Sequence, residues 1–114
     1  MKTLRNCLIA AACAVSAPAF TQSLTQEQRN LLNHLAQVMV IQHNCPEYES
    51  NDGLIAVALA RFNVRLSEPG TEAFFKARYA EQEKGMRAGK AACIVGWGLY
   101  GKGGRNVPNL LVER

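Results

Sequence analysis

The sequence lacks an apolar run long enough to cross a membrane. Its most apolar N-terminal stretch, from Cys7 to Val15, is far shorter than the roughly 20 residues that a spanning helix needs. It precedes Ala17-Pro18-Ala19, the small-residue pattern at which signal peptides are cleaved. We therefore expect residues 1–19 to be a secretory signal peptide, cleaved after Ala19. We expect residues 20–114 to form one domain without a transmembrane segment, in the periplasm or secreted.

Cysteine is scarce once those residues are removed. The chain has four cysteines, of which only Cys45 and Cys93 lie beyond residue 19. Two cysteines in an oxidising compartment most simply form one disulfide. Closing a loop of this length stabilises a fold by about 4 kcal/mol in the chain-entropy model. The sequence therefore predicts a structural Cys45–Cys93 bond.

A large excess of positive charge is also missing from the exported part. The whole chain has 13 basic and nine acidic residues, a net charge of +4, but Lys2 and Arg5 belong to the predicted signal peptide. The basic isoelectric point is thus partly a property of that segment. It gives no reason to expect nucleic acid as a partner.

The sequence shows no strand-like alternation of apolar and polar residues. Its apolar residues recur instead with the period of a helix. Leu31, Leu35 and Val38 recur at helical spacing, which predicts a helix over 26–43 that begins at a Ser23 or Thr25 cap and ends before Pro46. The stretch 45–53 is expected to be a loop. A second helix is expected from an Asp52 cap to about residue 63, where Asn63 tolerates the left-handed conformation.

A third helical region is expected after the Pro69-Gly70 turn, capped by Ser67 or Thr71. Its apolar stripe continues to Tyr100, and we expect a break near Gly85 or Gly89 because interior glycines weaken helices. Residues 110–112 are expected to fold back as an apolar clasp. The predicted fold is all-α, with three to four helices in a small single domain and the end of the first helix joined to the last helix by the disulfide.

The glycine-rich stretch "GWGLYGKGGRN" contains the G-x-G-x-x-G pattern of dinucleotide-binding proteins. That pattern needs a strand before it and a helix after it, whereas a helical stretch precedes it here. The P-loop alternative also fails, because Gly103 stands where a Ser or Thr should follow Lys102. We therefore expect no nucleotide, and expect Gly96 and Gly98 to permit close helix packing.

No constellation of catalytic side chains is visible, so we expect no catalytic residues, no cofactor and no metal. One alternative is a metal-binding or enzymatic site in the His43–Glu49 loop, where His43, Cys45, Glu47 and Glu49 alternate. A disulfide at Cys45 would remove the thiolate from that set.

Charge is distributed unevenly along the chain. Residues 20–83 carry five basic and eight acidic side chains, and residues 84–114 carry six basic and one acidic. A basic segment with interleaved aromatic residues suits an anionic partner. We therefore expect a non-enzymatic protein that binds a protein or an anionic envelope component. The expected binding residues are Lys90, Trp97, Tyr100, Lys102 and Arg105.

Short motifs of the chain resemble those of small exported helical families of alphaproteobacteria, which are domains of unknown function with one disulfide. The matching residues are Asn44, Cys45, Pro46, Cys93, Gly96, Leu110 and Leu111. The resemblance implies a helical fold and the disulfide, and implies no catalytic residue. In architecture alone, the chain is also similar to the periplasmic acid-stress chaperones, so a holdase-type chaperone is an alternative function.

The predicted leader and disulfide are tested together by intact mass. Protein expressed with its own N-terminus and exported should have the mass of residues 20–114, less the two thiol hydrogens, and should resist alkylation. A full-length mass or an alkylated product would contradict the prediction.

Overall fold

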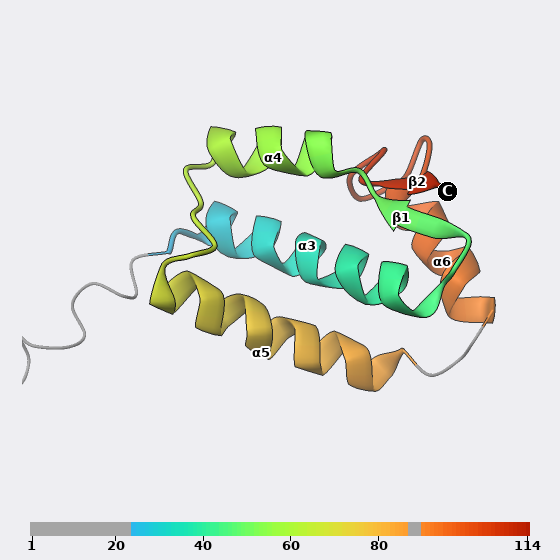
Figure 1. Ribbon diagram of the computed structural model, residues 1–114, viewed down its shortest axis with the longest axis horizontal. Helices are drawn as coiled ribbons and strands as arrows, with labels where there is room; N and C mark the ends of the chain where they lie inside the picture. The colour runs from blue at the N-terminus through green and yellow to red at the C-terminus, as the bar shows by residue number, and fades with distance from the viewer. Residues whose placement is uncertain (1–23, 87–89) are drawn as a thin grey trace, which may run out of the picture.

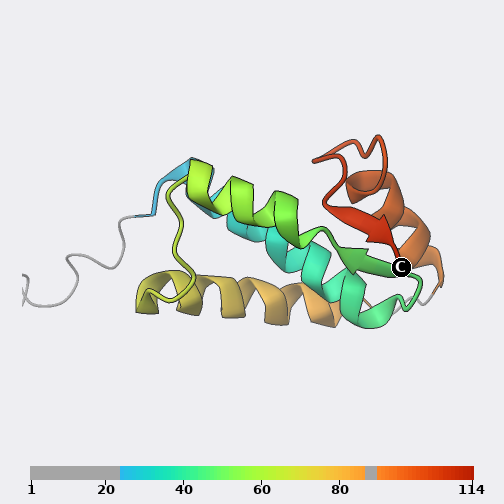
Figure 2. The ribbon, with the colours of Figure 1, turned by 45° about the horizontal axis from the view of Figure 1, so that its top comes forward.

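The computed structural model describes residues 24–86 and 90–114, which form a mostly helical fold with one small sheet (Figure 1). Helix α3 lies between α4 and α5, and α6 lies across the C-terminal end of α3 (Figures 1 and 2). The elements in order are α3 (Gln26–Asn44), β1 (Tyr48–Ser50), α4 (Asp52–Arg61), α5 (Pro69–Gly85), α6 (Lys90–Tyr100) and β2 (Leu111–Glu113). The helical expectation is confirmed, and the purely all-α expectation is corrected by the strands.

Helix α3 is the central element of the core. Its N-terminus is fixed by a capping box, in which the Gln28 N–H donates to Thr25 Oγ1 and the Thr25 N–H donates to Gln28 Oε1. This confirms the Thr25 cap, while Ser23 lies outside the described residues. The buried residues of α3 are Leu31, Leu32, Leu35, Ala36, Val38, Val40 and Ile41. Within the described ranges, none of the helices combines the length and the hydropathy needed to cross a bilayer.

Helix α4 packs on the core through the partly buried Leu54, Ile55, Ala58 and Leu59, and none of its ten residues is fully buried. Its cap is Asn51, whose side-chain oxygen accepts from the Leu54 N–H, and not Asp52 as expected. Asp52 instead accepts a hydrogen bond from Ser50 Oγ at 2.6 Å. The helix ends before Asn63, which has a positive φ of 58°, as the sequence predicts.

Helix α5 begins at Pro69 without a side-chain cap, so neither Ser67 nor Thr71 acts as predicted. Proline suits this first position because it needs no N–H donor there, and Thr71 is buried instead. The helix ends at Gly85, which confirms a break there. Gly89, the other expected break point, lies outside the described residues.

The sheet replaces part of the expected loop after Cys45. Strand β1 pairs antiparallel with β2, with Tyr48 opposite Glu113 and Ser50 opposite Leu111. Three-residue strands are too short to show alternation, which is why the sequence did not indicate them. Leu110 and Leu111 are buried, so the predicted C-terminal clasp is confirmed, with the added feature that its backbone pairs with β1.

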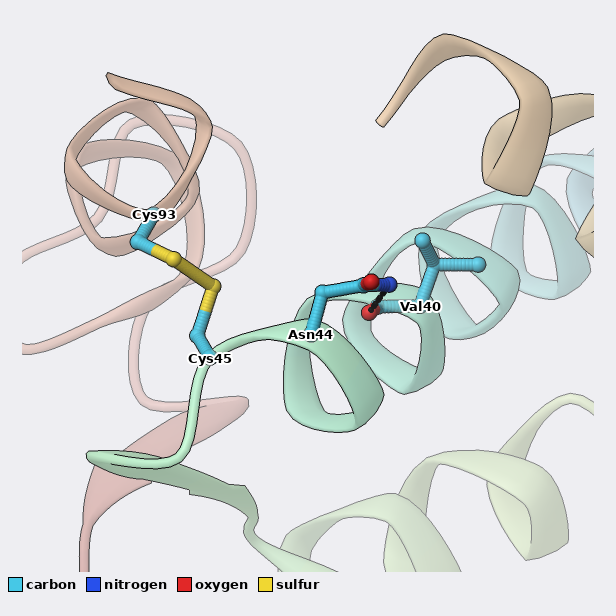
Figure 3. Close-up of a disulfide and its surroundings, with 4 residues drawn as sticks. All are labelled: Val40, Asn44, Cys45 and Cys93. Atoms are coloured by element: carbon cyan, nitrogen blue, oxygen red, sulfur yellow. Dashed lines mark hydrogen bonds between the residues drawn. A yellow bond between two sulfur atoms is a disulfide. The ribbon is translucent and has the colours of Figure 1, made fainter. Parts of the chain in front are cut away.

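The Cys45–Cys93 disulfide is present and links the residue after α3 to α6 (Figure 3). The two Cα atoms are 5.8 Å apart, and the residues are 48 positions apart in the sequence. Beside it, Asn44 Nδ2 donates to the Val40 carbonyl at 2.8 Å in the last turn of α3. Both sulfurs come from buried residues, as suits a structural bond.

The glycines around α6 differ in their surroundings. A Cβ on Gly96 would lie 2.7 Å from Ile41 Cδ1, which confirms its predicted role in close packing. A Cβ on Gly98 would meet no described atom within 4 Å, so the same prediction for Gly98 is wrong. A Cβ on Gly104 would lie 2.5 Å from the Leu99 carbonyl oxygen, where a backbone atom would have to move.

These surroundings predict opposite effects for two alanine substitutions. Gly98→Ala should raise the free energy of unfolding by up to about 1 kcal/mol, because alanine favours the helix and has room there. Gly104→Ala should lower it by about 1–3 kcal/mol because its methyl group overlaps backbone. Chemical denaturation of both variants measures the difference, and equal stabilities would contradict the packing described here.

Candidate interaction surface

Helix α6 is apolar on every side beyond its first residue, and its inner face is fixed to α3. Cys93 bonds to Cys45, Gly96 approaches Ile41, and Tyr100 is fully buried at 0% exposure. A helix that is apolar all round is normally buried all round. In α6 the inner face is buried, and the opposite face is not.

That opposite face forms an apolar surface, which we call the outer α6 stripe. It consists of Ala91, Ile94, Val95 and Gly98, all exposed and spaced three to four residues apart. Ile94 is 70% exposed and Val95 is 59% exposed. Because i, i+3 and i+4 positions share one face of a helix, the four residues form a continuous strip about two turns long.

The chain after α6 places two cations at one end of this stripe. The turn through Gly103, whose φ is +69°, brings the chain back so that the Arg105 N–H donates to the Gly98 carbonyl at 3.0 Å. Lys102 and Arg105 are both exposed. We call these two residues the basic loop. Positive charge at the C-terminal end of a helix is also favoured by the helix dipole.

Trp97 stands beside the outer α6 stripe, three residues after Ile94. It is half-buried and stacks on Tyr48 of β1, with ring centroids 4.7 Å apart and planes inclined by 14°. The stacking fixes the orientation of the indole and ties α6 to the sheet.

An apolar hollow of about 380 Å³ lies on the other side of the stripe, between α3, α5 and α6. Its walls include Ile41, Met86 and Leu99, with Gln37 and Gln82 as polar groups. Val95 belongs both to this hollow and to the outer α6 stripe, so the exposed apolar surface continues into a concave region.

The five binding residues predicted from the sequence therefore have different environments. Lys102 and Arg105 are exposed at the end of α6, and Trp97 is half-buried next to the stripe. Lys90 begins α6, but its side chain lies outside what the structure describes. Tyr100 is corrected to a core residue, because a fully buried side chain does not reach a partner.

Tyr100 instead centres a polar network inside the fold. Its hydroxyl donates to Gln37 Oε1, accepts from Asn106 Nδ2 at 3.3 Å and lies 2.8 Å from His34 Nδ1. Since the single hydroxyl proton goes to Gln37, His34 Nδ1 carries a proton and donates to Tyr100. Burial raises the pKa of Tyr100, and a smaller contribution from the Asn106 hydrogen bond lowers it.

Ile94 and Val95 are the surface residues that the sequence reasoning missed. The apolar stripe predicted from the sequence runs through Cys93, Trp97 and Tyr100, and the last two of these were expected to bind a partner. Ile94 and Val95 lie off that stripe and are apolar as well. Apolar residues on both faces of one helix were the available signal.

The structure places Gly96 and Gly98 of the glycine pattern in a helix and part of the His43–Glu49 loop in a strand. Gly96 and Gly98 lie inside α6, not in the turn between a strand and a helix that a dinucleotide fingerprint requires. Cys45 is disulfide-bonded, and Tyr48 to Ser50 form β1. In the two described ranges, no three His, Cys, Asp or Glu residues are grouped so that they could hold a metal ion.

Comparisons of this chain with known protein families, with curated proteins and with solved structures find no match. The resemblance to exported alphaproteobacterial families therefore stays a hypothesis. The chemistry of the site has to be argued from its own residues.

The polar network predicts a pH dependence of stability. Burial lowers the pKa of His34 below its usual 6.5, so the unfolded chain takes up a proton at a higher pH than the folded chain does. Stability contributed by neutral His34 is therefore complete above pH 6.5 and is lost as the pH falls through the lower, folded pKa. His34→Gln should flatten the stability profile in that window, measured by denaturation at several pH values. His43→Gln, at an exposed position, is the control, and an equal flattening there would contradict this role of His34.

Proposed function

We propose that the protein is a non-enzymatic binding protein, periplasmic or secreted, whose partner is a protein or an anionic component of the cell envelope. The outer α6 stripe and the basic loop form the contact surface. The observation that carries this proposal is the exposure of Ile94 and Val95 on a helix without a polar face.

Exposed apolar area supports binding because removing it from water is favourable. Burial of such surface contributes about 25 cal/mol per Å² before the costs of association are subtracted. Single exposed apolar residues are common on proteins, but a contiguous strip on one helix face is typical of an interaction site. Here the strip is continuous with the hollow between α3, α5 and α6.

The basic loop adds selectivity for an anionic partner. Lys102 and Arg105 stand at one end of the stripe, and long-range attraction of this kind raises association rates more than affinity. An acidic partner would therefore be drawn to the end of α6 and then held by apolar contact.

The contacts that hold α6 rigidly against the rest of the fold support a binding role as well. The disulfide, the close approach of Gly96 to Ile41 and the Trp97–Tyr48 stacking hold the helix in place. A surface that is rigid before binding loses little conformational entropy in the complex.

A holdase-type chaperone active at acidic pH is the second hypothesis. It is favoured by the position of His34, which is half-buried with Nδ1 2.8 Å from the Tyr100 hydroxyl. Burial lowers the pKa of His34, so the fold loses stability when acidified. Dye binding and suppressed aggregation of a client protein at low pH would separate this function from the first.

The first proposal is tested by photo-crosslinking in cells that export the full chain. A crosslinking amino acid at position 94 should form adducts with a protein or with an envelope lipid, because Ile94 belongs to the stripe. The control is position 57 on α4, since Val57 is 60% exposed and equally apolar. Lys102→Ala with Arg105→Ala should reduce the adducts at position 94 without lowering the melting temperature. Absence of adducts at position 94, or equal adducts at position 57, would overturn the proposal.

A further inference from the structure

We propose that the outer α6 stripe and the basic loop dock on an anionic lipid surface. This inference rests on the proposed function and names its partner. It is carried by the shape of the stripe, by the charges around it and by the position of the tryptophan.

The shape of the stripe, with two protruding side chains between small residues, suits contact with a membrane. Ile94 and Val95 protrude, while the neighbouring positions on the same face, Ala91 and Gly98, carry little or no side chain. The boundary between headgroups and acyl chains accepts such protruding apolar side chains without any matching pocket. A folded protein partner would instead need a complementary recess.

Basic side chains stand at one end of the stripe. Lys102 and Arg105 of the basic loop are exposed there, and residues 91–112 include no acidic residue. Each basic residue close to an anionic membrane raises the affinity about fivefold, and the effect is lost beyond a Debye length.

The other exposed apolar helix face has charges of both signs. On α4, Val57 is as exposed as Val95, with the acidic Asp52 at the start of the helix and the basic Arg61 at its end. An anionic surface would repel the acidic end. A second copy of the chain paired in parallel on α6 is also disfavoured, because the two basic loops would meet.

The tryptophan stands where an interfacial residue is expected. Trp97 is the only tryptophan of the chain, is half-buried and follows Ile94 by one helical turn. With the stripe against a bilayer, the indole would be at headgroup level, where tryptophan is enriched in membrane proteins. Its stacking on Tyr48 keeps it there without free rotation.

The experiment is a titration of the exported protein with vesicles. One vesicle contains phosphatidylglycerol mixed with phosphatidylcholine, and the other contains phosphatidylcholine alone. We expect cosedimentation and a blue shift of Trp97 emission with the anionic vesicles only. Binding should weaken as salt is raised. Every variant has the same residues before Leu24, so any contribution of that segment cancels.

Two substitutions test the two parts of the surface. Ile94→Asp should lower the partition coefficient at least tenfold, because it removes an apolar contact and adds a negative charge. Lys102→Gln with Arg105→Gln should lower it about 25-fold, from two losses of about fivefold each. Circular dichroism should show unchanged folding, since these side chains are exposed.

The matched controls lie on α4 and in the segment that follows it. Val57→Asp repeats the apolar-to-acidic change, and Arg61→Gln with Arg65→Gln repeats the loss of two exposed cations. Both should leave the partition coefficient within about twofold of its original value, apart from the general change in net charge. No binding to anionic vesicles, equal binding to both vesicles, or greater losses in the control variants would overturn the inference.

Failure of this inference is distinguishable from failure of the proposed function. Adducts between position 94 and a protein, together with no vesicle binding, would retain the function and replace the lipid by an acidic protein. Absence of any adduct and of vesicle binding would overturn both.

Discussion

The covalent bond between Cys45 and Cys93 fixes the position of α6 against the rest of the fold. It joins the residue that follows the central helix to the first turns of α6, across 48 positions of sequence. In the chain-entropy model such a bond stabilises the fold by about 4 kcal/mol, a large part of the 5–15 kcal/mol that is typical of a domain. The core is small, and α4 contributes no buried residue to it. Without the bond, α6 would depend on its inner face and on the Trp97–Tyr48 contact alone.

Helix α6 serves two purposes with its two faces, and this division is the basis of the functional proposal. The inner face packs on α3 through Gly96. On the same face, the buried Tyr100 is hydrogen-bonded to His34 and Gln37. The outer face leaves Ile94 and Val95 in water. A helix used only for stability would have polar residues on its outer face, since these cost nothing there. The stripe is therefore best explained by a surface that covers it.

The sequence allowed the helices and the disulfide to be predicted, because both leave strong local signals. The period of Leu31, Leu35 and Val38 predicts α3, and two cysteines leave one pairing. The strands were not predictable, because three residues show no period and their pairing joins distant segments. The cap of α4 was misassigned because Asn51 and Asp52 are adjacent and have equal capping chemistry. The cap of α5 was misassigned because this helix begins at Pro69 without a side-chain cap. In the site, Lys102 and Arg105 were identified by charge alone, whereas the burial of Tyr100 depends on three partners that no local pattern reveals.

The pairing of β1 with β2 has a consequence for the point during synthesis at which the chain can finish folding. Strand β2 follows every other described element in the sequence, and it completes the sheet. The Asn51 N–H donates to the carbonyl of Leu110, which is synthesised much later than Asn51. Leu110 and Leu111 also complete the core only at that point. A chain that is still being synthesised thus lacks part of its sheet, part of its core and, until Cys93 has emerged, its covalent link. Closure of the fold is therefore delayed until residues 110–113 are free to pair and pack.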